Sequence, residues 1–214
     1  MTVVHILGGD SVPVTNIACF GRTYAKHAAE LGNAVPKQPL LFLKSVRALR
    51  PLSEGPIAFS DETFHHEAEV VLLIGCDVAQ GSAATWGDVE AVGLGLDLTR
   101  RGLQSELKSN GHPWTTSKSF SGSALVSPLT PLASVAERDA IEFTLSVNGD
   151  LRQTGTTKNL THDVPALLSQ LSALTPLGRG DLVFTGTPEG VGEIRAGDRF
   201  ELASPVLGTH AGTL

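Results

Sequence analysis

Short runs of valine, leucine and isoleucine, each bounded by glycine, proline or small polar residues, recur along most of the chain. Runs of this length with turn residues on both sides are typical of β-strands. The pattern predicts strands over residues 14–20, 40–44, 67–74, 91–98, 141–147, 181–185 and 199–203. The tripeptide Asn148-Gly149-Asp150 follows an alternating segment and predicts a tight hairpin turn.

Apolar residues recur at helical spacing in three segments. These are residues 24–31, ending before Gly32, residues 101–109, ending before Gly111, and residues 164–174, ending before Pro176. Residues 45–64 are irregular and contain proline, which is typical of a long loop. We therefore expect a mostly β fold with short helices, of the α+β class.

Composition narrows the classes of protein that fit. With 214 residues, 41% hydrophobic and 18% charged, the chain can bury the core of one domain, so we expect residues 1–214 to form a single domain. The formal net charge of −6, with no cluster of lysine or arginine, argues against a nucleic-acid partner but leaves small anionic substrates open. Cys19 and Cys76 form neither a disulfide framework nor a zinc motif.

The amino-terminal segment MTVVHILGGD has no positive leader, and no segment is long and apolar enough to predict a membrane span. We therefore expect no membrane partner and a cytoplasmic location.

Three carboxylates are the most informative polar residues. Glu67 and Glu69 begin a predicted strand and, two residues apart, point to the same face, while Asp97 lies near the end of another predicted strand. Adjacent like charges need compensation, and Mg²⁺ or Mn²⁺ prefers carboxylate oxygens. A divalent-metal site is one interpretation. The alternative is that both glutamates simply face solvent.

His27 and Glu30 are three residues apart in a predicted helix and therefore share a face. A carboxylate behind an imidazole stabilises the imidazolium, which makes this pair a candidate general base. The alternative is a solvated pair, since Lys26 offers Glu30 a competing partner. His65 shares the face of the two glutamates and is either a ligand or supporting group, or a hydrogen-bonded histidine at a strand entrance.

Four cations lie near predicted strand ends or in glycine- and serine-rich segments, where loops gather around a site. They are Arg22, Lys44, Arg101 and Lys118. Singly each would be an ordinary surface charge, but together they suit a substrate with carboxylates or a developing oxyanion. The segment LVFTGTPEGVG lacks the spacing of a phosphate loop and instead predicts a tight turn that presents the hydroxyls of Thr185 and Thr187.

Seven motifs, in this order, resemble the fumarylacetoacetate hydrolase family: GRTYAKH, PLLFLK, HHEAEVVLLIG, LDLTRRGLQ, PWTTSKSF, SVNGDLRQTGTT and FTGTPEGVG. The resemblance covers about residues 17–198 and is greatest for the short acylpyruvate hydrolase and oxaloacetate decarboxylase branch. It implies a mixed β-roll of the type formed by the family's carboxy-terminal domain, a homodimer, and Mg²⁺ or Mn²⁺, with Ca²⁺ as a substitute in vitro.

The resemblance also implies roles for individual residues. The positions that match metal ligands are Glu67, Glu69 and Asp97. His27 and Glu30 match the general-base pair, on a helix that orders when substrate binds, and Lys118 matches the residue that stabilises an oxyanion. The positions that line the pocket or contact the substrate are Arg22, Lys44, Arg101, Gln104 and Thr187.

The implied function is divalent-metal-dependent hydrolysis of a C–C bond in a small anionic 2-oxo acid of the 3-acylpyruvate type. Decarboxylation of oxaloacetate passes through the same pyruvate enolate, so one site could perform both reactions. The runner-up within the family is an isomerase/decarboxylase of 2-hydroxy-dienedioates in aromatic catabolism. A non-catalytic keto-acid binder is the alternative from another class, and the joint presence of His27, Glu30 and Lys118 favours an enzyme.

The chain departs from the family pattern at four places. Thr23 stands where asparagine is frequent, Ser45 where proline often follows the lysine, and Gly102 where an acidic residue often follows the arginine. The tail SPVLGTHAGTL is shorter or more irregular than the closing strand that the family implies. These departures concern pocket detail and the sheet edge, and leave the predicted metal site intact.

Overall fold

A computed structural model describes residues 2–30, 32, 36, 38–52 and 62–214. Its larger sheet is built around the antiparallel strands β7 (Ala68–Ile74) and β8 (Val89–Asp97). The order across this sheet is β4 (Leu40–Lys44), β3 (Ile17–Gly21), β13 (Leu182–Phe184), β7, β8, β9 (Ala124–Val126) and β5 (Leu49–Pro51), and β10 (Thr130–Pro131) also pairs with β8. The sheet is mixed, because β13–β3 and β5–β9 pair in parallel.

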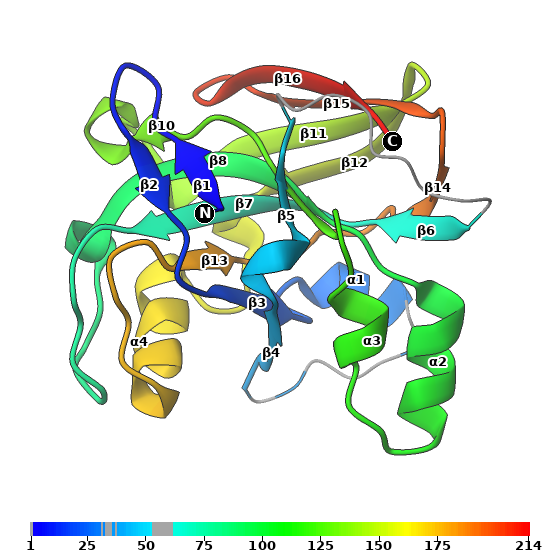
Figure 1. The fold of residues 1–214 in the computed structure, drawn as a ribbon, viewed down its shortest axis with the longest axis horizontal. Helices are drawn as coiled ribbons and strands as arrows, with labels where there is room; N and C mark the ends of the chain where they lie inside the picture. Colours follow the sequence, from blue (N-terminus) through cyan, green and yellow to red (C-terminus); the bar gives the residue numbers. More distant parts are fainter. Residues whose placement is uncertain (1, 31, 33–35, 37, 53–61) are drawn as a thin grey trace.

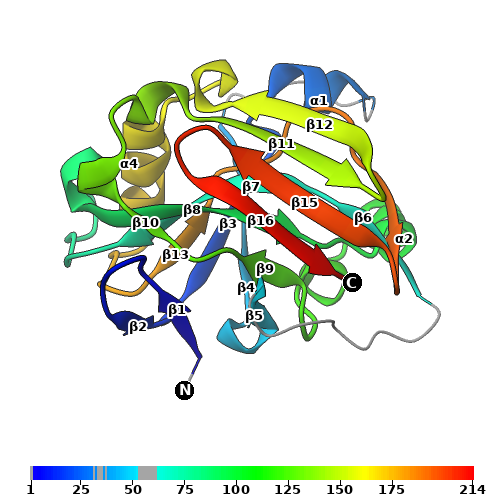
Figure 2. The same ribbon diagram turned by 90° about the horizontal axis from the view of Figure 1, so that it is seen from above.

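A second, antiparallel sheet lies across the first (Figures 1 and 2). Its order is β12 (Asp150–Thr156), β11 (Glu142–Val147), β15 (Arg199–Ser204) and β16 (Gly208–Thr213). Two small strand pairs lie outside these sheets: β1 (Val3–His5) with β2 (Ser11–Pro13), and β14 (Gly192–Arg195) with β6 (Thr63–His66). The predicted mostly β roll is therefore confirmed.

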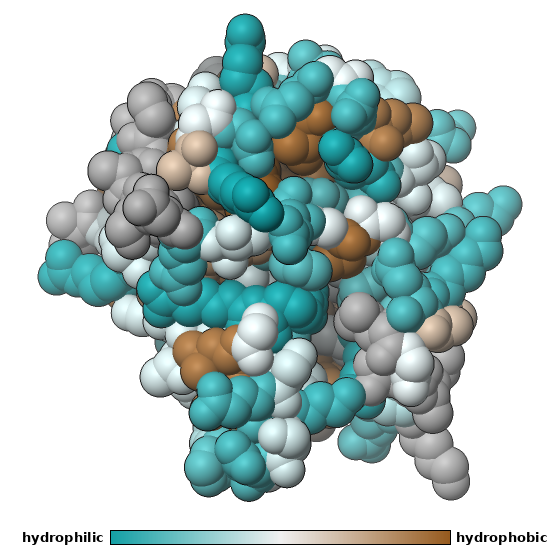
Figure 3. All heavy atoms as spheres, turned by 90° about the vertical axis from the view of Figure 1, so that its right-hand side faces the viewer, coloured by the Kyte–Doolittle hydropathy of each residue, from teal (hydrophilic) through white to brown (hydrophobic). Residues whose placement is uncertain are grey.

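The helices lie at two ends of the molecule (Figure 1). Helix α4 (Val164–Leu174) covers one end, and α1 (Ala25–Glu30), α2 (Arg101–Ser109) and α3 (Thr115–Lys118) gather at the other. The face that carries β6, β14 and α2 is mostly hydrophilic (Figure 3). Among the described residues, no helix is long and apolar enough to cross a membrane.

Strand β7 lies between two hydrophobic clusters of the described residues. Val70 and Leu72 belong to the cluster that includes Phe143 of the second sheet. Val71 and Leu73, which point to the opposite face, belong to the other cluster. Every residue of β7 is buried, which explains its uninterrupted apolar sequence. Polar groups at its beginning are therefore held by a rigid, doubly covered strand.

Each of the seven segments predicted as strands contains a strand, with bounds shifted by up to three residues. The hairpin prediction is also confirmed, because β11 and β12 are joined through Asn148 (φ 53°) and Gly149 (φ 87°). Positive φ at both positions is the geometry of a type I′ turn. The helix predictions 101–109 and 164–174 coincide with α2 and α4, while residue 31, which ended the first helix prediction, lies outside the described residues.

Two sequence predictions are wrong. The carboxy-terminal tail is not irregular, because β16 pairs with β15 along its whole length and closes the second sheet. The segment 45–64 is not a continuous loop, since it contains β5 and the beginning of β6, while its residues 53–61 lie outside the described residues. Both errors concern strands whose pairing partners are remote in sequence or whose residues are mostly small.

Candidate functional site

The three carboxylates meet where β7 begins and β8 ends. Glu67 lies in the break between β6 and β7, Glu69 pairs with Gly95 in the β7–β8 register, and the Asp97 N–H donates to the Glu67 carbonyl (2.9 Å). Each side chain offers an oxygen within 4.8 Å of the others. Glu67 is 6% exposed, Glu69 1% and Asp97 1%. The alternative that the glutamates face solvent is therefore wrong.

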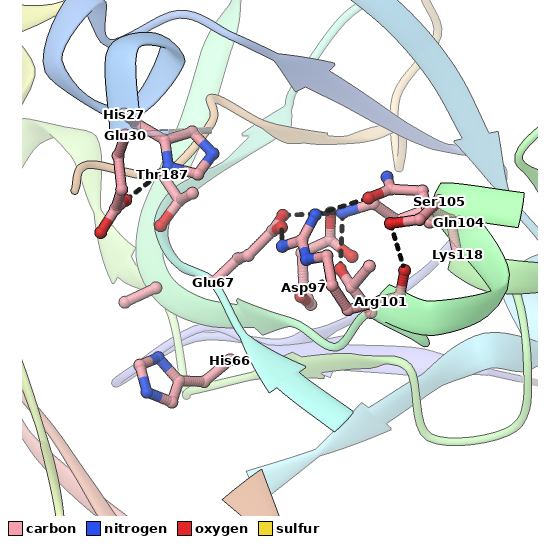
Figure 4. A network of polar contacts seen from close by, with 12 residues as sticks. His27, Glu30, His66, Glu67, Asp97, Arg101, Gln104, Ser105, Lys118 and Thr187 are labelled. Atoms are coloured by element: carbon pink, nitrogen blue, oxygen red, sulfur yellow. Dashed lines mark hydrogen bonds and ion pairs between the residues drawn. The ribbon is translucent and has the colours of Figure 1, made fainter. Parts of the chain in front are cut away.

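Buried Lys118 and partly buried Arg101 compensate two of these three carboxylates, Glu67 and Asp97 (Figure 4). Lys118 Nζ donates to Glu67 Oε2 (2.7 Å), to Asp97 Oδ2 (2.8 Å) and to the Thr99 hydroxyl (2.7 Å). The Arg101 guanidinium donates to Glu67 Oε1. Charges taken out of water require such pairing. Lys118 and Arg101 thus reach the acids from α3 and α2, which are remote in sequence from β7.

Glu69 has a different environment from Glu67. It accepts the backbone N–H of Gly186 at 2.6 Å, and no lysine or arginine in the described part of the chain forms an ion pair with it. Burial, together with Asp97 and Glu67, raises the pKa of Glu69 well above that of an ordinary glutamate. For Glu67, burial acts in the same direction, but the charges of Lys118 and Arg101 outweigh it and lower its pKa well below the usual range.

The three carboxylates fit a hard divalent cation. Asp97 Oδ1 is buried and has no aligned hydrogen bond, although the Lys44 ammonium lies 2.8 Å from it. Glu69 has no lysine or arginine partner among the described residues, so a cation would stabilise its ionised form. An all-oxygen donor set is the chemistry that Mg²⁺ and Mn²⁺ favour. The residues that could hold such an ion are Glu67, Glu69 and Asp97.

The histidine–glutamate pair lies on α1, across the pocket from the acids (Figure 4). His27 Nδ1 is 3.3 Å from Glu30 Oε2, and the His27 side chain is 7% exposed. Glu30 also accepts the backbone N–H of Gly190 at 3.1 Å, which ties it to the segment after β13. Lys26, the competing partner, instead lies 3.5 Å from Glu189. With Nδ1 turned to Glu30, Nε2 is the nitrogen left to exchange a proton in the pocket.

A cavity of about 130 Å³ joins these groups. Most of the predicted site residues line it: Arg22, His27, Glu67, Glu69, Arg101, Gln104, Lys118 and Thr187. Lys44, predicted as a substrate contact, does not; it is 3% exposed and bonds Asp97, Ser123 and the Lys118 carbonyl behind the acids. Its place in the structure is that of a support for Asp97.

Other wall residues were missed by sequence reasoning: Phe20, Gly21, Phe42, Ser105, Lys108 and Trp114. Ser105 and Lys108 lie four and seven residues after Arg101 on α2, so their helical spacing from Arg101 could have identified them. The aromatic residues come from three separate elements and carry no local signal. His65 forms a backbone bridge with Thr99 and does not belong to the carboxylate cluster, and burial and the Arg101 charge lower its pKa.

Comparisons with known proteins found similar sequences and structures. An oxaloacetate tautomerase from Arabidopsis thaliana, named as mitochondrial, is 40% identical over 191 residues, covering 86% of this chain and 84% of that protein. An oxaloacetate tautomerase from Escherichia coli (strain K12) is 38% identical over 190 residues, covering 87% of this chain and 86% of that protein. The crystal structure of a fumarylpyruvate hydrolase from Pseudomonas aeruginosa, in complex with Mn²⁺ and pyruvate, has a TM-score of 0.90 and 33% identity, covering 99% of this chain and 94% of that chain.

The family description "Fumarylacetoacetate (FAA) hydrolase C-terminal" matches residues 16–214. The match begins one residue before the predicted extent and continues to the end of the chain, so the tail is part of the common fold. The seven motifs, the mixed β-roll and the match over nearly the whole chain agree. The chain belongs to the fumarylacetoacetate hydrolase family.

Proposed function

We propose that this protein is a divalent-metal-dependent enzyme that interconverts the keto and enol forms of oxaloacetate. The observation that carries the proposal is the position of His27, whose imidazole is backed by Glu30 and lines the same small cavity as Glu67, Glu69 and the cationic side chains of Arg22, Arg101 and Lys118. The two oxaloacetate tautomerases at 38–40% identity support this substrate.

The cationic side chains account for substrate binding. Arg22, Arg101 and Lys118 line the cavity and would attract the two carboxylates of a small dianion. Arg101 also donates to Gln104 through the other end of its guanidinium, which holds the group in one orientation. A cavity of about 130 Å³ favours a compact substrate over a long one.

His27 and Glu30 account for proton transfer. His27 removes a proton from C3, the C–H electron pair becomes the C2=C3 double bond, and the 2-oxo oxygen gains the negative charge. Glu30 stabilises the imidazolium that results. Return of a proton to that oxygen completes the enol, and the reverse sequence restores the ketone. A divalent ion held by Glu67, Glu69 and Asp97 would supply a Lewis acid next to the 2-oxo group.

Hydrolytic cleavage of a 3-acylpyruvate is the second candidate. The same pair could take a proton from water instead of carbon, so that hydroxide adds to the distal carbonyl and the C–C bond breaks to leave pyruvate as its enolate. The relative that was crystallised with Mn²⁺ and pyruvate supports this reaction. Decarboxylation of oxaloacetate and isomerisation of a 2-hydroxy-dienoate would use the same binding groups.

A substrate panel tests the proposal and ranks the candidates. The purified protein is assayed with Mg²⁺, with Mn²⁺ and with a chelator on oxaloacetate, acetylpyruvate, fumarylpyruvate and a 2-hydroxy-2,4-dienoate, and products are identified by NMR. We expect the fastest turnover to be keto–enol exchange of oxaloacetate, lost with the chelator. Faster cleavage of an acylpyruvate would favour the second candidate, and metal-independent turnover would contradict both.

A further inference from the structure

Gln153, on β12, connects the acidic segment to the segment after β13. It is 1% exposed. Its side-chain oxygen accepts the backbone N–H of Ala68 (3.0 Å) and lies 3.0 Å from His66 Nδ1. Its side-chain nitrogen donates to the Pro188 carbonyl (3.0 Å) and to Thr187 Oγ1 (2.8 Å). Ala68 lies between Glu67 and Glu69, so one amide braces the carboxylates against the wall that carries Thr187.

The partners of this amide fix its orientation. The Ala68 N–H can only donate, so the atom facing it must be the amide oxygen. The Pro188 carbonyl can only accept, so the atom facing it must be the nitrogen. Both N–H hydrogens are then used, one on Pro188 and one on Thr187, and His66 Nδ1 must donate to the oxygen. Exchanging the oxygen and nitrogen would break two bonds to groups that cannot change roles.

Thr187 is therefore held as an acceptor toward Gln153, and its own hydrogen is available elsewhere. Within the described residues, no acceptor takes this hydrogen, and Thr187 lines the cavity. Resting on the proposed function, we propose that Gln153 is a positioning residue that makes Thr187 a hydrogen-bond donor to an anionic oxygen of the substrate. A threonine with the opposite polarity would present only lone pairs to the cavity and repel such an oxygen.

Calorimetry with oxalate, a probe that is not turned over, tests whether Gln153 positions Thr187. Oxalate binding is measured in the presence of Mn²⁺ for the wild type, Thr187→Val, Gln153→Glu and the double variant. A glutamate at this position would accept the Thr187 hydrogen instead of donating to Thr187 Oγ1. We expect each single change to weaken oxalate binding about tenfold, as for loss of one hydrogen bond to a charged group. The double variant should lose no more than either single variant.

Thr185→Val is the matched control. Thr185 lies two residues earlier, but its hydroxyl donates to the Val70 carbonyl (3.0 Å) and does not line the cavity, so its loss should change oxalate affinity by less than about twofold. Two results would overturn the inference. One is a double variant whose loss of oxalate affinity is the product of the losses in Thr187→Val and Gln153→Glu. The other is an unchanged oxalate affinity in Thr187→Val.

Neutron diffraction on deuterated wild-type crystals gives a second measurement, which does not depend on any variant folding. It should show two deuterons on the Gln153 nitrogen and the Thr187 deuteron directed into the cavity. A Thr187 deuteron directed at Gln153 would overturn the inference. Neither measurement uses turnover, so an oxaloacetate assay on the same samples separates failure of the proposed function from failure of the positioning role.

Discussion

Among single side chains, Glu69 is a buried carboxylate that forms no ion pair with a lysine or arginine of the described residues. Its pKa is raised by burial and by Asp97 and Glu67, so the folded protein without metal holds a proton that the unfolded chain releases near the ordinary carboxyl range. A raised pKa in the folded state means that this contribution to stability is present at low pH and is lost as pH rises. A cation at the site would stabilise ionised Glu69 and so prevent this loss of stability at high pH.

The first prediction concerns Glu69→Gln. At pH 8 without metal, the variant should unfold at a higher temperature than the wild type, by about 2–4 °C for each 1 kcal/mol gained. The difference should shrink as pH falls, because the raised pKa favours protonated Glu69 in the folded wild type. Scanning calorimetry in a chelating buffer measures both values. Lower stability of the variant than of the wild type at pH 8 would contradict a raised pKa of Glu69 in the folded protein.

When Mn²⁺ replaces the chelator in the same experiment, the wild type should unfold at a higher temperature than Glu69→Gln. Mn²⁺ at 100 times its dissociation constant should raise the free energy of unfolding of the wild type by about 2.7 kcal/mol. Glu69→Gln, with one fewer anionic ligand, should gain much less from Mn²⁺. Asp163→Asn is a suitable control, because Asp163 is exposed, caps α4 through the Ala166 N–H and does not line the cavity. Its response to Mn²⁺ should equal that of the wild type.

The second prediction separates proton transfer from binding. His27→Ala should lower kcat for oxaloacetate by about 10²–10⁴-fold, the range typical of a lost general base. Oxalate affinity should change little, because cations hold the carboxylates. Lys26→Ala, on the same helix and with its side chain 82% exposed, should retain the wild-type kcat. A large loss of oxalate affinity with unchanged kcat would assign His27 to binding instead.

The candidate residues were predictable where their signal is local. Glu67 and Glu69 share a face because they are two apart, and His27 and Glu30 because they are three apart. The pairing of Lys118 with Glu67 spans 51 positions and has no local signature. The same applies to Lys44, which the resemblance placed at the substrate and the structure places behind Asp97. Residue spacing along the sequence identifies candidate ligands, but the ion pairs between cations and acids depend on the tertiary fold.

Among the elements, the turn after β13 leaves no room for a side chain at residue 186. Gly186 has φ +97°, and a Cβ added there would lie 1.9 Å from Thr23 Oγ1. Thr23, one of the departures from the family pattern, uses this hydroxyl to hold the Thr185 carbonyl (2.8 Å). The turn that carries Thr187 therefore depends on the absence of a side chain at residue 186.

The third prediction follows for two glycines. Gly186→Ala should lower the free energy of unfolding by at least about 2 kcal/mol, through strain and the clash with Thr23. Gly102→Ala, in α2, meets no atom within 4 Å and should raise it by up to about 1 kcal/mol through helix propensity. Urea unfolding followed by circular dichroism measures both. Equal effects of the two changes would contradict the assigned role of the turn.

Elements were predictable when their own residues carried the pattern. The buried run of β7 and the capped helix α4 are visible in sequence. Strand β5, with three residues, exists because β9 lies alongside it, and β14 because β6 does. Strand β16 is made of glycine, threonine, alanine and one histidine, and its conformation comes from pairing with β15. Such strands depend on tertiary contacts that a local window does not contain.

For the whole molecule, the fourth prediction is a homodimer, as the family resemblance implies. Strand β4 ends the larger sheet, and Leu43 on it is 58% exposed, which makes this edge the surface to test. Light scattering should give twice the mass of one chain, and Leu43→Glu should shift the equilibrium toward the monomer. Leu174→Glu, at a comparably exposed position on α4, should not. A monomeric wild type would contradict the prediction.

The hairpin of β7 and β8 has a practical consequence for handling the protein. Its acidic end and its connection, residues 75–88, lie at opposite ends of the two strands. The exposed Cys76 lies just beyond β7, about 20 Å from Glu69 at the rise of a strand, whereas Cys19 is buried. A thiol-reactive dye or solid support would therefore attach at one position of each chain, at the end of the hairpin opposite the acids. Immobilised in this way, the protein would keep its cavity open to solution and could serve as a reusable catalyst or sensor.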